Sequence, residues 1–311
     1  MKKGALAEFT RKGLAQFMEA LLKAMATRDP GAAPLALDAR YTENGQELAI
    51  GDGLWGTLDR AGKYRHLFAD TSSGTAVMFT TVSEGDKRAI LSVRIRVKDG
   101  AIHDVEAIVV RPGLMGSVTA YADGPEKLEQ AGGPEPAWFE PIPPEERLGR
   151  AELQRIANLY FEAIERNDGK GEYPFADDCV RMEHGYRTSG EPDAKEAGVE
   201  RDPDTPYAPD FKAMGVKEQF ETGFFAFVTN IRDRRFVVID PELGVVCAMA
   251  CFDHNGTVRD YRLADGTPAK AGLSQPFTWQ IAEAFKVENG LITLIEAVLS
   301  PVPYGMKPGW D

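Results

Sequence analysis

A hairpin sequence that occurs twice, 190 residues apart, is the feature that most limits how this chain can fold. Residues 96–110 read RVKDGAIHDVEAIVV and residues 286–300 read KVENGLITLIEAVLS. Each copy predicts two strands joined by an Asp-Gly or Asn-Gly turn, because these dipeptides accept the positive φ of a tight hairpin. The identical aligned positions are Val97 and Val287, Gly100 and Gly290, Ile102 and Ile292, Glu106 and Glu296, and Ala107 and Ala297.

The rest of the chain repeats in the same order. An amphipathic helix is expected at residues 5–27, and a second one around residues 153–164. The second copy is longer because of an insertion near residues 187–215, which reads as a lid or interface loop, and another at 255–276. Order and spacing both repeat, so the sequence predicts a tandem duplication. Two further pairs of segments align between the copies: RYTENG (40–45) with VRMEHG (180–185), and residues 64–79 with 234–249.

The composition restricts the possible partners. A net charge of −12 argues against nucleic-acid binding and against anionic membrane surfaces, because both need a basic face. The three cysteines have no metal-type spacing, and no apolar run reaches the roughly 18 residues of a membrane span. We therefore expect a cytoplasmic protein that binds neither nucleic acid nor membranes.

The predicted organisation is two domains of the α+β class. The first domain spans residues 1–115 and the second spans residues 148–311. Residues 116–147 are rich in proline and glycine and are predicted to form an exposed linker. Each domain is expected to be a cone, in which an N-terminal helix packs in a strongly curved antiparallel sheet.

The order of helix, TENG or MEHG segment and final hairpin resembles the SnoaL-like, nuclear-transport-factor-2-like α+β cone superfamily, here in tandem. That superfamily includes ketosteroid isomerases, scytalone dehydratase, polyketide cyclases and limonene epoxide hydrolase, and also non-catalytic binding modules. The resemblance implies an apolar cone in which an Asp, Glu or His moves a proton without a cofactor. It does not choose among these activities.

The repeated glutamates are the first candidates for chemistry. In a strand, Ile102, Asp104, Glu106 and Ile108 share one face, and Glu296 has the same place in the second copy. A carboxylate among aliphatic side chains is costly unless it is paired or functional. The alternative is structural: each glutamate pairs with an arginine, the repeated candidates being Arg65 and Arg235.

The pair Glu183-His184 is the second candidate, because His184 replaces Asn44 of the first copy. Histidine is the side chain whose ordinary pKa lies closest to neutrality. The alternative is a hydrogen-bonded structural histidine. For Asp253-His254, a turn with exposed side chains is the favoured interpretation.

Aromatic residues are expected to shape the pocket. Tyr186 and Tyr207 lie in the polar insertion, where core packing explains them less well, and Trp279 lies in a strand of the same copy. Tyr41 and Trp55 are the first-copy candidates, although core packing is the alternative for most aromatic residues. Arg235 and Glu106 complete the predicted substrate-binding set.

The sequence thus predicts a cofactor-independent lyase, dehydratase or isomerase for a small apolar or aromatic hydroxylated molecule. The expected catalytic residues are His184, Glu183 and Glu296, with no metal. A non-catalytic binding or scaffold protein is the alternative, and an epoxide hydrolase is the weaker third possibility. The two halves are expected to form an internal pseudo-dimer that could also form a homodimer.

Overall fold

The computed structural model describes residues 9–113, 122–191, 211, 213–271 and 275–310. Its first half contains α1 (Arg11–Thr27), η1 (Pro30–Ala32), β1 (Leu35–Glu43), β2 (Gln46–Leu48), α2 (Leu54–Thr57), β3 (Arg60–Asp70), β4 (Thr75–Glu84), β5 (Lys87–Lys98) and β6 (Ala101–Val110). The connector contains α3 (Gly124–Ala131) and η3 (Pro136–Phe139). The second half contains α4 (Arg150–Arg166), β7 (Phe175–Glu183), β8 (Tyr186–Arg187), α5 (Val216–Glu221), η4 (Phe224–Phe227), β9 (Asn230–Asp240), β10 (Val245–His254), β11 (Asp260–Arg262), β12 (Pro268–Lys270), β13 (Phe277–Glu288) and β14 (Leu291–Pro303).

The two halves have the same sheet topology. The strand orders are β2-β1-β6-β5-β4-β3 and β8-β7-β14-β13-β10-β9. In each sheet, the first long strand runs parallel to the last one (β1 with β6, β7 with β14), and the remaining pairs are antiparallel. The prediction of two similar halves is therefore confirmed, as a mixed α and β fold with two six-stranded sheets and few helices. The small ribbon of β11 and β12 is added in the second half only.

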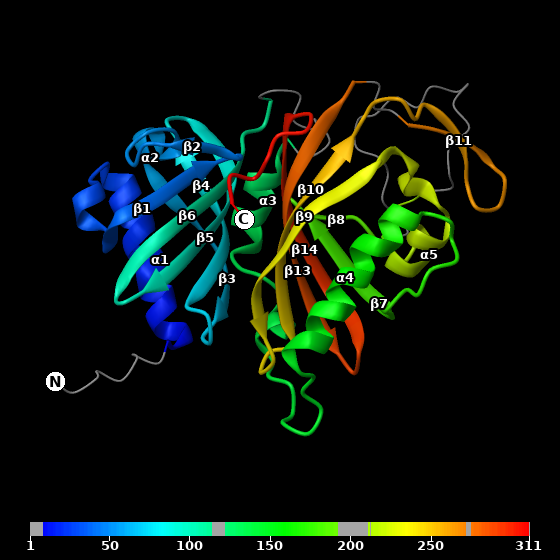
Figure 1. The fold of residues 1–311 in the computed structure, drawn as a ribbon, viewed down its shortest axis with the longest axis horizontal. Helices are drawn as coiled ribbons and strands as arrows, with labels where there is room; N and C mark the ends of the chain where they lie inside the picture. The colour runs from blue at the N-terminus through cyan, green and yellow to red at the C-terminus, as the bar shows by residue number, and fades with distance from the viewer. Residues whose placement is uncertain (1–8, 114–121, 192–210, 212, 272–274, 311) are drawn as a thin grey trace.

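The sheets pack against each other, and the two long helices lie on the outside, α1 on the first sheet and α4 on the second (Figure 1). We call the side of a sheet covered by its helix the helix face and the opposite side the interface face. Each helix face carries its own apolar core. A third apolar cluster joins the two interface faces and includes Phe68, Phe79, Met249 and Val298.

One residue in each copy changes the predicted faces. Strand pairing skips His103 in β6 and Thr293 in β14, so each strand carries one extra residue near its start. An extra residue turns the preceding side chains to the other face. Ile102 therefore joins the core of the first helix face, whereas Glu106 lies on the interface face. The prediction that these two share a face is wrong for this reason.

The connector is packed rather than exposed over part of its length. Leu128, Trp138 and Ile142 are 5%, 4% and 7% exposed. Lys286, which is fully buried on β13, donates hydrogen bonds to the carbonyls of Glu140 (2.6 Å) and Leu243 (2.7 Å). The described part of the connector is thus packed against the sheets. The domain boundaries themselves stay a prediction.

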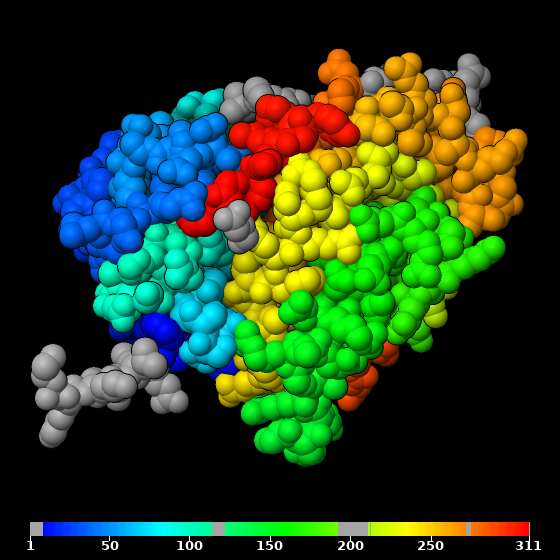
Figure 2. All heavy atoms as spheres, viewed as in Figure 1, coloured from blue at the N-terminus to red at the C-terminus, as the bar shows by residue number. Residues whose placement is uncertain are grey.

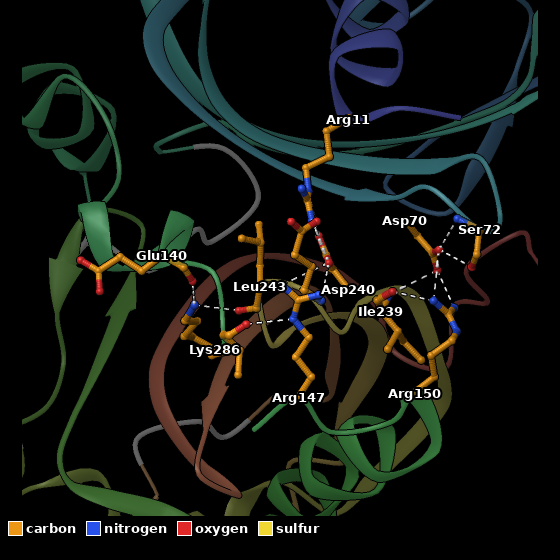
Figure 3. A network of polar contacts seen from close by, with 12 residues as sticks. Arg11, Asp70, Ser72, Glu140, Arg147, Arg150, Ile239, Asp240, Leu243 and Lys286 are labelled. Carbon is orange, nitrogen blue, oxygen red and sulfur yellow. Dashed lines mark hydrogen bonds and ion pairs between the residues drawn. The ribbon is translucent and has the colours of Figure 1, made fainter. Parts of the chain in front are cut away.

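Two reciprocal ion pairs hold the halves together (Figure 3). Arg11, the first residue of α1, binds Asp240 at the end of β9 at 2.8 Å. Arg150, the first residue of α4, binds Asp70 at the end of β3 at 2.6 Å. Each helix therefore starts on its own sheet but bonds with the opposite one, as in a two-fold exchange between subunits.

The C-terminal segment adds a further contact, which crosses from the second half to the first (Figure 2). Arg40 donates a hydrogen bond to the carbonyl of Gly309 at 3.0 Å, and the indole N–H of Trp310 donates to the hydroxyl of Thr42 at 2.7 Å. The indole ring also lies against the guanidinium groups of Arg40 and Arg94. The end of the chain therefore fixes β1 against the second half.

Candidate functional site

The helix face of the second sheet carries two carboxyl groups in one cross-strand row. Strand pairing places Glu183, Ala297, Glu283 and Ala248 side by side on β7, β14, β13 and β10. Neighbouring strands lie about 4.8 Å apart, so the backbones of the two glutamates are about 10 Å apart. The alanines of this row have short side chains, so the two glutamate side chains extend further from the sheet than their neighbours in the row.

Glu283 is the most perturbed acid of this row. Its side chain lies within the apolar core around α4 and the residue is 2% exposed. Burial is the main cause that raises the pKa of Glu283 to about 8; the Tyr160 hydroxyl and Arg181 oppose the increase, and the nearby charge of Glu183 adds to it. Glu283 is therefore mainly protonated at pH 7 and can donate a proton.

Tyr160 of α4 reaches the same point from the helix. Burial raises its pKa well above the ordinary value, and the charge of Glu283 adds to the increase. The tyrosine therefore stays a neutral hydroxyl that can donate a hydrogen bond. Its ring packs against Phe175, Phe220 and Phe285, which fix the position of the hydroxyl.

Arg181 holds the polar end of the row. It is 3% exposed, and its Nε lies 3.1 Å from Oε1 of Glu183 and 3.0 Å from the hydroxyl of Thr188. Its Nη2 donates to Oε1 of Gln219 at 2.6 Å, and Gln219 in turn donates to the carbonyls of Thr188 and Phe211. One row thus combines the protonated acid Glu283 with Glu183, which is paired with an arginine.

The first half has no such pair. Val93 and Met78 take the positions of Glu283 and Ala248 in the corresponding row. Glu43, which corresponds to Glu183, accepts hydrogen bonds from the Tyr41 hydroxyl, the Leu54 N–H and Arg111 at 2.6–2.8 Å. These bonds engage both carboxylate oxygens of Glu43 and indicate a structural role.

Tyr41 and Trp55, which the sequence suggested for substrate binding, are fully buried in the core of the first half. Their rings make an edge contact at 6.1 Å. Core packing therefore accounts for both side chains, and a binding role stays a prediction.

His184 repeats the hydrogen bond made by its counterpart in the first half. Both His184 and Asn44 have positive φ, 49° and 46°, in the turn after the first long strand. The Leu299 N–H donates to Nε2 of His184 at 3.0 Å, as the Val109 N–H donates to Oδ1 of Asn44 at 2.8 Å. Burial lowers the pKa of His184 to about 4. Its catalytic role stays a prediction, with Nε2 engaged by the neighbouring strand.

Glu106 and Glu296 are buried, 4% and 6% exposed, but they lie between the sheets rather than on a helix face, because each bonds to a side chain of the other half. Arg235 of the other half binds Glu106 at 2.6 Å, and Arg94 binds it at 2.7 Å. This matches the structural alternative for Glu106. The structure does not bring either glutamate together with Glu183.

Glu296 has different partners from those expected. The Tyr64 hydroxyl donates to Oε1 at 2.8 Å, and Nδ1 of His66 lies 2.6 Å from Oε2. The sequence alignment of residues 64–79 with 234–249 matched Arg65 with Arg235. Strand pairing instead puts His66 in the position that corresponds to Arg235, because β9 contains a register shift. Arg65 instead bonds to Glu19 at 2.9 Å.

The remaining predicted residues are spread over the second half. Trp279 lies on the helix face of β13, in the same alternation as Glu283, and is partly exposed. Tyr186 on β8 faces the connector, where the ammonium group of Lys127 lies 4.7 Å from its ring centroid. Tyr207 lies outside the described residues.

Sequence reasoning missed Glu283, Tyr160, Arg181 and Gln219. The argument applied to Glu106, a carboxylate among aliphatic residues of a strand, applies equally to Glu283 within TWQIAEAFK. The comparison of copies also marks it, because Val93 occupies the aligned position. No comparable signal identifies Gln219, which lies beyond the insertion and has no aligned partner.

The comparisons with known proteins do not assign a function. A family described as a domain of unknown function (DUF8021) matches residues 146–299, within the second half. No curated protein matches the sequence. A de novo designed protein with a curved β-sheet is 16% identical, covers 36% of this chain and 95% of its own, and has a TM-score of 0.29. AclR of Streptomyces galilaeus, a proposed hydroxylase, is 16% identical, covers 49% and 91%, and has a TM-score of 0.28.

In the part of the chain that the structure describes, every helix is too short or too polar to cross a membrane.

Proposed function

We propose that the second half is a cofactor-independent acid–base catalyst of the lyase, dehydratase or isomerase type, acting on a small apolar or aromatic hydroxylated molecule. The observation that carries the proposal is Glu283, a buried carboxyl group whose pKa is raised to about 8, in one row with Glu183. A proton donor and a proton acceptor facing one space are what such eliminations and isomerisations need.

In a dehydration, Glu183 takes a proton from carbon while Glu283 gives its proton to the leaving hydroxyl. The C–H electron pair forms the C=C bond, the C–O bond breaks, and water leaves. Glu283 is then ionised and Glu183 protonated, and exchange of one proton with solvent resets both. Arg181 positions Glu183, and the Tyr160 hydroxyl positions Glu283.

The assignment to the SnoaL-like, nuclear-transport-factor-2-like superfamily, with cone-shaped sheets, is part of this proposal. It is supported by one long helix and one six-stranded sheet in each half, with the same strand order. It is also supported by packing of the two sheets through their interface faces, which gives an internal pseudo-dimer. The predicted use of a small molecule without a cofactor follows from this assignment.

The test is a screen of hydroxylated aromatic compounds. Loss of water is detected by mass spectrometry, and isomerisation by a change in absorbance. For a compound that reacts, Glu283→Gln is expected to lower kcat by about 100-fold or more. Glu296→Gln is the matched control, because it also changes a buried glutamate of the same half but one outside the row. Full activity in folded Glu283→Gln, or loss in Glu296→Gln alone, would refute the assignment.

A non-catalytic role is the second candidate for the first half. Its helix face is filled by Tyr41, Leu54 and Trp55, each fully buried, and the oxygens of Glu43 are bonded within the half. We propose that this half is a scaffold that supports the second sheet. Variants of Glu43 are then expected to change stability and leave kcat unchanged.

A further inference from the structure

A second buried polar side chain on the helix face of the second sheet has one ring nitrogen without a partner among the described residues. His254 ends β10 and is 1% exposed. Its Nδ1 lies 3.1 Å from the carbonyl of Phe252, so Nδ1 carries the proton and donates it. Burial lowers the pKa of His254 to about 4, so the ring is neutral at pH 7 and Nε2 is an acceptor. Among the described residues, no donor reaches Nε2.

The surroundings of this nitrogen are aromatic. The ring of Phe277 stacks on His254 at 4.4 Å with an angle of 7° between the planes, and Phe227 lies parallel on the other side at 5.9 Å. Trp279 presents its edge at 4.5 Å. Phe227, Phe277 and Trp279 are all partly exposed, so the aromatic group forms part of the accessible rim of the helix face.

A buried acceptor without a donor costs about 1–3 kcal/mol, which a ligand recovers when it supplies the donor. A stack of flat rings selects a flat ligand. These two preferences together describe an aromatic molecule that carries a hydroxyl group. A purely structural histidine would explain the stacking and the bond from Nδ1, but it would leave Nε2 without a donor.

We propose that Nε2 of His254 accepts a hydrogen bond from the hydroxyl of an aromatic ligand, with Phe227, Phe277 and Trp279 holding its ring. The inference goes beyond the proposed function and names a separate binding site. His254 lies opposite Phe277 and Glu283 lies opposite Ala248, six residues away along β10, or about 20 Å. A small ligand bound at His254 therefore does not reach Glu283, and His254 takes no part in the proton transfers there.

The experiment compares two probes that differ only in the donor, 2-naphthol and 2-methoxynaphthalene, by calorimetric titration of the full chain. 2-Naphthol is expected to bind about tenfold more tightly, and the difference is expected to disappear in His254→Phe. His254→Gln keeps an acceptor and should retain part of the preference. His184→Asn, a change at the other buried histidine of this half, should retain all of it.

A spectroscopic measurement checks that the hydrogen bond is direct. In ¹⁵N spectra, the unprotonated nitrogen resonance that is absent from His254→Phe should move upfield when 2-naphthol is added, and should stay in place with 2-methoxynaphthalene. Equal affinity for the two probes, no binding of either, or a preference that survives in His254→Phe would overturn the proposal. Both measurements need no turnover, so they remain decisive even if Glu283→Gln proves fully active.

Discussion

The two helix faces of this molecule have the same architecture and different contents. In the first half, Val93 and Met78 continue an apolar core, and Glu43 is bonded on both oxygens. In the second half, Glu283 and Ala248 stand in their places, and the Leu21 position of the helix becomes Tyr160. The difference shows that two halves with the same strand order can differ in whether one row of the core is apolar or polar.

The largest expected effect concerns the interface, where the halves differ in how they neutralise a repeated glutamate. Arg235→Met removes one of two cations from buried Glu106 and should lower the free energy of unfolding by about 3–5 kcal/mol, because an undercompensated charge is left behind. Chemical denaturation measures it. The double variant Arg235→Met/Glu106→Gln should recover most of the loss, and no recovery would mean that packing rather than charge is responsible.

The next effect concerns Glu283, which stands in the cross-strand row that differs between the two helix faces. Below pH 4.5, Glu283 is protonated in both the folded and the unfolded chain; between pH 4.5 and about 8, only the unfolded chain releases the proton. The stability of the wild type therefore falls as pH rises through this window. Glu283→Gln should raise the free energy of unfolding at pH 8 by roughly 2–4 kcal/mol, with little gain at pH 4.

Denaturation curves at these two pH values measure the effect of Glu283→Gln. The matched change in the other half, Val93→Gln, should destabilise at both pH values. If Glu283→Gln were neutral at pH 8, Glu283 would be ionised in the folded chain and its role as a proton donor would fall.

The smallest effect concerns the turn residues His184 and Asn44. His184→Asn copies the first half into the second and should change stability by less than about 1 kcal/mol at pH 7, because Asn can accept the Leu299 N–H. The pKa of His184 is about 4 when folded and 6.5 when free, so the wild type loses stability as pH falls between these values.

His184→Asn should lose less stability than the wild type as pH falls from 6.5 to 4. It should still lose some, because His254 also has a lowered pKa. Thermal melts over this range measure it. Activity gives a second use of the same variant: a folded His184→Asn without turnover would support the catalytic role predicted for His184, and full turnover would leave that residue as a structural turn.

Much of the fold could be predicted because the turns are explicit in the sequence. The Asp99-Gly100 and Asn289-Gly290 pairs fix both final hairpins, and positive φ at all four residues agrees with that reading. The helix predicted from residue 5 is observed from Arg11, after Thr10 accepts the N–H of Gly13. The burial of the connector was not predictable, because its composition is that of a linker while a buried Lys286 binds one of its carbonyls.

The residues of the proposed site were predicted only in part. Glu183 was a candidate because its neighbour His184 replaces Asn44 of the first copy, and Trp279 because it is aromatic. Glu106 and Glu296 were assigned to a pocket because a single inserted residue, His103 or Thr293, has no signature in a pattern of alternation. Arg181 and Gln219 meet only through the tertiary structure, since 38 residues separate them.

The reciprocal pairs of Arg11 with Asp240 and Arg150 with Asp70 have a consequence for how such a molecule can change over time. In a dimer of identical chains, any substitution at the contact appears on both sides at once. Here both partners are encoded in one polypeptide, so each side can be altered independently while the association stays guaranteed. Fusion thus removes the symmetry constraint, and one copy is free to keep the assembly while the other acquires a chemical role.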